Sequence, residues 1–200
     1  MRRVLVCGAL LLAVWGIVAG CGAPRASGPY VGDASGARDE ERARSLVDEA
    51  SLCMPEDPEG AERLLREALE ADLFQAKAHN NLGVLLLAKD DLYGAAHEFE
   101  WARKLLPGHP EPRVNLAITL ERAGQVREAE ASYASALEVY PGYMPAVQGA
   151  ARLAVAEGPL DDLAIQSLRR VAIEGESLEW RNWAQLVLAR TPEGAHPGRL

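Results

Sequence analysis

The sequence lacks an apolar run long enough to cross a membrane. The apolar stretch at its N-terminus covers Val4 to Val18, which is 15 residues, whereas a spanning helix needs about 20. Arg2 and Arg3 precede this stretch and small residues follow it. A short positive segment, an apolar core of about 7–15 residues and small residues are typical of a secretory signal peptide, which is removed. We therefore expect residues 1–20 to be a signal peptide; an uncleaved anchor is the alternative.

Cysteine is scarce, with three residues in 200. Cys7 lies in the expected signal peptide, and Cys21 directly follows it. If Cys21 is modified, Cys53 is the one free cysteine of the mature chain, and an intramolecular disulfide is excluded even in an oxidising compartment. We expect Cys53 to be a small buried hydrophobe; a reactive thiol is the alternative.

Basic residues are outnumbered by acidic ones. The chain holds 21 Lys and Arg against 29 Asp and Glu. Loss of Arg2 and Arg3 with the signal peptide leaves 19 against 29, a net side-chain charge of −10. This balance argues against binding of nucleic acid and against adhesion to anionic lipid through a basic patch.

Patterns that carry chemistry are missing as well. The sequence has no Gly-rich phosphate loop, no Gly-x-Ser-x-Gly elbow and no cysteine with a partnered histidine. No metal-ligand spacing occurs among the four histidines, which are His79, His97, His109 and His196. The acidic pairs Asp90-Asp91 and Asp161-Asp162 fall in expected turns, where Asp favours the bend and caps the next helix. We therefore expect no catalytic residue, no metal and no cofactor; an enzyme with an unrecognised site is the alternative.

What the sequence does contain is an internal repeat. From about Asp39 the composition turns to Ala, Leu, Glu and Arg without alternating β-branched runs, which predicts helices. Two 34-residue segments align, AKAHNNLGVLLLAKDDLYGAAHEFEWARKLLPGH (residues 76–109) and PEPRVNLAITLERAGQVREAEASYASALEVYPGY (residues 110–143). The matched pairs are Leu82 and Leu116, Gly83 and Ala117, Ala95 and Ala129, Phe99 and Tyr133, Ala102 and Ala136, and Pro107 and Pro141.

This pattern resembles the tetratricopeptide repeat, in which two helices cross closely. Small residues allow the crossing, the aromatic fills the space between the helices, and the proline ends the second helix. The resemblance implies an all-α fold, a solenoid of about four repeats that ends in a capping helix. In this register His79 occupies a position that is usually a buried aromatic, so we expect a hydrogen-bonded core histidine.

The expected parts of the chain follow from this register. Ser177 is the expected N-cap of the capping helix, and Trp180 and Trp183 are expected in its core-facing stripe; a binding surface is the alternative for the two tryptophans. The parts are residues 1–20 (signal peptide), 21–38 (lipidated N-terminus and flexible tether), 39–176 (repeat domain, divided at about 39–75, 76–109, 110–143 and 144–176), 177–191 (capping helix) and 192–200 (frayed tail).

The residues at the end of the apolar stretch carry a second resemblance. Val18-Ala19-Gly20-Cys21 is similar to the lipobox of bacterial lipoproteins. In that family the cysteine thiol takes a diacylglyceryl group and the chain is cut just before it, so Cys21 is the expected lipidation site. Two or more acyl chains hold firmly to a membrane. Gly22 stands where an Asp would retain such a protein at the inner membrane, which indicates the outer membrane, facing the periplasm.

The resemblance also implies a binding groove on the concave face of the solenoid, formed by the first helices of successive repeats. An asparagine at the position of Asn81 and Asn115 bonds a peptide backbone in several relatives; bonding to a neighbouring helix is the alternative. Glu111 stands where binding of a chaperone-tail carboxylate would need a lysine, so we do not expect that ligand. The expected groove residues are Lys77, Asn80, Asn81, Val84, Leu87, Val114, Asn115, Ile118 and Arg122.

These features predict a non-enzymatic interaction scaffold, a lipoprotein of the bacterial envelope that binds a segment of another envelope protein. Small tetratricopeptide lipoproteins include pilotins, so a factor for type IV pilus or secretion-channel assembly is one alternative. An adaptor for cell-wall enzymes is another. The architecture alone does not separate them, because fold does not fix function.

Overall fold

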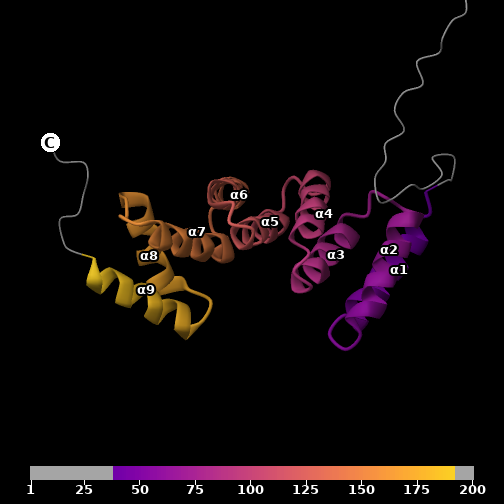
Figure 1. Cartoon of the computed structure of the whole chain (residues 1–200), viewed down its shortest axis with the longest axis horizontal. Helices are drawn as coiled ribbons and strands as arrows, with labels where there is room; N and C mark the ends of the chain where they lie inside the picture. The colour runs from indigo at the N-terminus through magenta and orange to yellow at the C-terminus, as the bar shows by residue number, and fades with distance from the viewer. Residues whose placement is uncertain (1–37, 192–200) are drawn as a thin grey trace, which may run out of the picture. The chain divides into compact units, whose positions relative to one another are not determined.

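The computed structural model of the chain describes residues 38–191, and within that range all regular structure is helical (Figure 1). The signal peptide, Cys21, the tether up to residue 37 and the tail from residue 192 lie outside the described residues. The helices are α1 (Glu40–Cys53), α2 (Pro58–Ala71), α3 (Ala76–Ala88), α4 (Leu92–Leu105), α5 (Glu111–Arg122), α6 (Val126–Val139), α7 (Met144–Glu157), α8 (Asp162–Glu174) and α9 (Leu178–Arg190).

The helices pack as consecutive pairs. Within each repeat the first helix contacts the second, in the pairs α1–α2, α3–α4, α5–α6 and α7–α8. Each second helix also contacts the first helix of the next repeat, and α8 contacts α9 in the same way. The expected all-α solenoid of four repeats with a closing helix is therefore confirmed.

Side-chain caps begin five of the described helices. In each case the oxygen of the capping side chain accepts a hydrogen bond from a backbone N–H in the first turn, which satisfies one of the free donors there. The capping residues are Asp39, Asp57, Asp91, Asp161 and Ser177. The roles expected for Ser177 and for the two acidic pairs are thus confirmed, and Asp90 adopts the left-handed bend with φ of 64°.

Two buried aromatics fill the space between helices, as the repeat pattern predicts. A Cβ atom at Gly83 would lie 2.7 Å from the ring of Phe99, so a larger residue at this crossing of α3 and α4 would force the ring to shift. Tyr133 extends to the next repeat, where a Cβ at Gly149 of α7 would lie 2.3 Å from its ring. Both rings are fully buried. The stack is therefore held by aromatic contacts within a repeat and between repeats.

Two core expectations need correction. Cys53 is half-buried and its thiol lies 3.5 Å from the carbonyl oxygen of Ala50, so it is not a fully buried hydrophobe. Leu120 stands 34 residues after the buried Leu86, so the repeat register predicts a core position, but Leu120 is also half-buried. One side of Leu120 packs against the core cluster that contains Tyr133. Its other side stays exposed in a groove between α4 and α6, because these two helices do not meet over α5.

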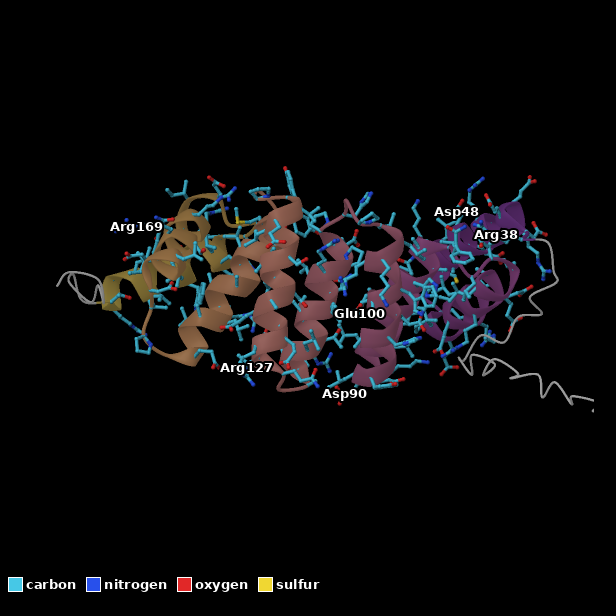
Figure 2. The ribbon with its side chains drawn as sticks, turned by 90° about the horizontal axis from the view of Figure 1, so that it is seen from above. Arg38, Asp48, Asp90, Glu100, Arg127 and Arg169 are labelled. Carbon is cyan, nitrogen blue, oxygen red and sulfur yellow. The ribbon has the colours of Figure 1, made fainter. Side chains whose placement is uncertain are left out.

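Charged side chains are spread along the whole row of helices, as the labelled Asp90, Glu100, Arg127 and Arg169 show in Figure 2. Acidic and basic side chains thus occur along the same row of helices. None of the helices in residues 38–191 is both long and apolar enough to span a membrane.

Candidate interaction surface

The first helices of successive repeats form one continuous surface. Besides their contacts with second helices, α1 contacts α3, α3 contacts α5, and α5 contacts α7. No comparable contacts join α2, α4, α6 and α8. Helices that approach each other across repeats lie on the inner side of a curved stack, so α1, α3, α5 and α7 form the concave face of this unit.

The predicted groove residues differ in how far their side chains are exposed to solvent. The exposed ones are Lys77, Val84 and Arg122; the half-buried ones are Asn81, Leu87, Asn115 and Ile118; the buried ones are Asn80 and Val114. Val84 is 39% exposed, which is high for an apolar side chain in the middle of a helix. It is the apolar side chain of the predicted set that is most open to a partner.

Val114 does not line the groove as predicted. It is 4% exposed and belongs to the core cluster with Ala117, Tyr133 and Ala146. The reason is that α7 packs against α5 at this level and covers it. Ile118 packs partly against the same cluster, so only one side of it is open to a partner.

The amides of the concave face are bonded to neighbouring helices. Asn81 donates from Nδ2 to the hydroxyl of Ser51 on α1 at 3.1 Å. Asn115, at the same repeat position, donates from Nδ2 to Oδ1 of Asn80 on α3, also at 3.1 Å. Asn80 in turn donates to Glu111 at 3.4 Å. The alternative left open by the sequence, bonding between helices, is thus present at both positions, and each amide links its helix to the preceding first helix.

Two arginines form ion pairs at the C-terminal ends of α3 and α5, which we call the edge of the concave face. Arg122 donates to the Leu87 carbonyl oxygen at 2.9 Å and to Asp90 at 2.7 Å, which joins α5 to the end of α3. Arg152 of α7 pairs with both oxygens of Glu121, one of them at 2.9 Å. The edge is therefore polar and internally paired.

The buried phenol of Tyr133 also contacts Glu121 at this edge. It donates a hydrogen bond to Glu121 at 3.3 Å. Burial, with a further contribution from the Glu121 carboxylate, raises the pKa of Tyr133 to about 12, so the phenol is neutral at pH 7.

His79 is a hydrogen-bonded core residue, as expected. It is fully buried, its Nδ1 lies 2.6 Å from a carboxylate oxygen of Glu98, and its Nε2 lies 2.8 Å from the Leu73 carbonyl oxygen. Its ring stacks on Trp101 with centroids 5.4 Å apart. His79 therefore ties α4 to the loop between α2 and α3. Among residues 38–191, no group of three or more His, Cys, Asp or Glu side chains is placed to hold a metal ion.

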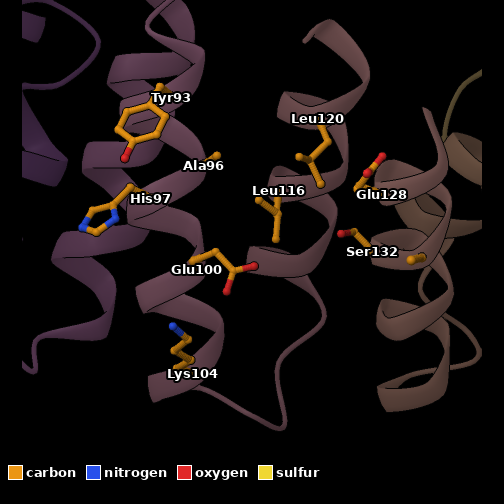
Figure 3. A pocket seen from close by; sticks show the side chains of 10 residues that line it. Tyr93, Ala96, His97, Glu100, Lys104, Leu116, Leu120, Glu128 and Ser132 are labelled. Atoms are coloured by element: carbon orange, nitrogen blue, oxygen red, sulfur yellow. The ribbon is translucent and has the colours of Figure 1, made fainter. Parts of the chain in front are cut away.

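A groove on the outer side of the stack was not predicted from the sequence. Figure 3 shows it between α4 and α6, with Leu116 and Leu120 of α5 at its floor. Its main cavity has a volume of about 500 Å³. The small residues Ala96 and Ala131 that line the groove are not among the pairs matched between the two repeats, so the repeat pattern did not indicate it.

Comparison with known proteins agrees with this architecture. The sequence family described as protein kinase G tetratricopeptide repeat matches residues 44–188. No protein of curated function matches the chain. The first tetratricopeptide domain of Spaghetti (RPAP3), bound to the HSP90 peptide SRMEEVD, is similar in structure with a TM-score of 0.58. It is 15% identical, and the match covers 61% of this chain and 98% of that one.

Two bacterial structures are also similar. An O-GlcNAc transferase mutant from Thermobaculum terrenum is 26% identical with a TM-score of 0.59, and the match covers 68% of this chain but 27% of that longer one. A tetratricopeptide repeat protein from Parabacteroides merdae is 17% identical with a TM-score of 0.62, and the match covers 74% and 59% of the two chains. These likenesses concern the helical stack.

Proposed function

The chain belongs to the protein kinase G tetratricopeptide repeat family, and from this premise we propose that it is a non-enzymatic scaffold that binds a segment of a partner protein on its concave face. Repeats of this fold serve in protein–protein interaction; the RPAP3 domains, for example, were solved with HSP90 and HSP70 peptides. The observation that carries the proposal for this chain is Val84, an exposed apolar side chain in the middle of α3 on the concave face. Exposed apolar area rimmed by polar groups marks interaction surfaces.

The surface around Val84 suits an extended or helical protein segment. Leu87 lies one turn further along α3 and adds apolar area, while Lys77 lies exposed at the start of the helix. The Nδ2 donors of Asn81 and Asn115 are used between helices. Their carbonyl oxygens are left to accept hydrogen bonds from a bound backbone.

Replacing Val84 with Glu is expected to weaken partner binding at least tenfold without unfolding the chain. The side chain points outward, so the fold tolerates the charge, but a bound partner would bury that charge against apolar atoms. The measurement is the amount of partner that co-purifies after crosslinking from membranes, with circular dichroism as the fold check. Val84→Ala is the matched control and should retain most of the partner. A folded Val84→Glu variant that keeps its partner would contradict the concave site.

Within this proposal the chain is a lipoprotein of the bacterial envelope, held to the outer membrane through Cys21 and facing the periplasm. The support is the sequence Val18-Ala19-Gly20-Cys21 after an apolar stretch that is too short to span a bilayer. The partner is then another envelope protein. Assembly of a pilus or secretion channel and recruitment of cell-wall enzymes are the two settings that such an adaptor would serve.

Replacing Cys21 with Ser is expected to abolish lipidation and processing completely. Serine lacks the thiol that accepts the diacylglyceryl group, and cleavage follows that transfer. Cells are labelled with a radioactive fatty acid, and the chain is analysed by gel and by mass. Cys53→Ser serves as the control and should be labelled and cut normally. A Cys21→Ser protein that still takes up label and reaches the mature mass would rule out this anchor.

A further inference from the structure

The outer groove between α4 and α6 is distinct from the concave face. Its main cavity of about 500 Å³ continues into a second one of about 220 Å³, because the two share lining residues. The shared residues are Glu100, Leu116, Ala131 and Ser132. α5 thus presents Asn115 and Ile118 to the concave face and Leu116 and Leu120 to this groove.

The two ends of the groove differ in chemistry. The larger cavity has an apolar floor of Leu116 and Leu120 and an exposed tyrosine, Tyr93, at its rim. The carboxylates of Glu100 and Glu128 also line it and disfavour an anion at this end. In Figure 3, Tyr93 and Lys104 lie at opposite ends of the α4 side. The smaller cavity is lined by two arginines and two serines, namely Arg103, Arg113, Ser132 and Ser135, together with Glu100.

Arg113 is a buried cation that has no carboxylate within salt-bridge distance among residues 38–191. It is 9% exposed. Its Nε donates to the Ser135 hydroxyl at 3.0 Å and its Nη1 to the His109 carbonyl oxygen at 2.9 Å. Burial and the neighbouring charge of Arg103 lower the pKa of Arg113, and Glu138 offsets this only in part. The positive charge of Arg113 is therefore under-compensated.

Arg103 adds a second unsatisfied feature. One nitrogen, Nη2, donates to Glu100 at 2.7 Å. The Nε of Arg103 is buried and has no hydrogen-bond partner within the described part of the chain. A buried N–H without an acceptor is costly, and native structures rarely leave one. Glu100 pairs with Arg103 and leaves Arg113 without a carboxylate partner in the described residues, so the smaller cavity fits one further anion.

We propose that the outer groove binds a partner protein segment in which an aspartate or glutamate lies next to an apolar side chain. The carboxylate is received by Arg103, Arg113 and the serine hydroxyls, and the apolar side chain lies on Leu116 and Leu120. Charge complementarity favours this occupant, because the smaller cavity holds two arginines and one glutamate in a chain whose net charge is −8. A small inorganic anion would fill only the smaller cavity and would leave the apolar floor uncovered.

The test is a selection of random 15-residue peptides, displayed on phage, against the full-length protein in detergent. Peptides that bind Ala131→Trp are depleted first, because Ala131 lines both cavities and a tryptophan there fills them. Ala131 is exposed, so the variant is expected to fold. Ala134→Trp, on an exposed site of α6 that lines neither cavity, is the matched control.

The proposal expects peptides that carry an acidic residue next to apolar ones. They should bind wild type and Ala134→Trp equally, and Arg103→Gln at least tenfold more weakly. Changing the peptide's Glu to Gln should also cost at least tenfold. Binding to Val84→Glu should be unchanged, which separates this groove from the concave site.

Three results would overturn the proposal. One is that no peptide remains after depletion on Ala131→Trp. Another is that the selected peptides bind equally well after their Glu is changed to Gln. The third is that they lose binding to Val84→Glu but not to Arg103→Gln, which would place them on the concave face. If Ala131→Trp does not fold, the same selection with depletion on Arg103→Gln decides the question.

Discussion

Replacing Glu98 with Ala is expected to lower the free energy of unfolding by about 3–5 kcal/mol, the usual cost of removing one partner of a buried pair. Glu98 is 3% exposed, and His79 is fully enclosed. Both ring nitrogens of His79 face acceptors, whereas a neutral imidazole has a single N–H to donate. Without the carboxylate, the Nδ1 of His79 loses this buried hydrogen bond, and the smaller side chain leaves a cavity.

Urea unfolding measures the loss of unfolding free energy as a lower midpoint concentration of urea, provided that the dependence of the free energy on urea concentration is unchanged. Glu98→Gln is the matched control, since its amide has the same size and can donate to a neutral ring nitrogen, so a smaller loss is expected. Glu174→Ala removes a partner of Arg170 in an exposed pair and should cost about 1 kcal/mol or less. If Glu98→Ala is no less stable than Glu174→Ala, the buried pair does not stabilise the second repeat.

Deleting residues 177–200 is expected to destabilise the domain by about 5 kcal/mol or more and to cause aggregation. This deletion removes α9, whose Ala184 is fully buried and whose Trp180 and Trp183 pack on the core of the fourth repeat. The two indoles also contact each other edge to face with centroids 5.4 Å apart. Half-burial of two such rings removes roughly 200 Å² from water at about 25 cal/mol per Å².

Melting temperature and light scattering would show this loss directly. Deletion of residues 192–200 alone is the control and should leave both unchanged, because that segment lies beyond α9. The core left open by the larger deletion includes Val147, Leu168 and Val171. A monomeric protein with an unchanged melting temperature after loss of residues 177–200 would show that α9 is not a structural cap.

The helical stack could be predicted because each repeat uses the same local rules. The repeat pattern predicts that Gly83 lies against the ring of Phe99. Ser177 and Asp91 cap α9 and α4 for the same reason, since each side-chain oxygen accepts a hydrogen bond from a free backbone N–H in the first turn. The position of His79 also predicted its burial. Its partner Glu98 did not follow from the pattern, because it lies 19 residues away on another helix.

The surfaces were harder to predict, since they depend on how closely consecutive repeats pack. Val114 occupies a repeat position that is expected on the concave face, but the contact between α5 and α7 buries its side chain. Asn81 and Asn115 share a position, and in both repeats the preceding first helix is near enough to take their amide hydrogens. The outer groove arises from the spacing of α4 and α6, which no single-repeat pattern contains.

Site-specific photo-crosslinking tests the central claim, that the concave face holds a partner segment. Benzoylphenylalanine is placed at Val84 on α3 or at Leu163 in the first turn of α8, which is 70% exposed on a second helix. After irradiation of intact cells, the account predicts a discrete protein adduct from position 84 and none from position 163. An adduct from position 163 without one from position 84 would contradict it.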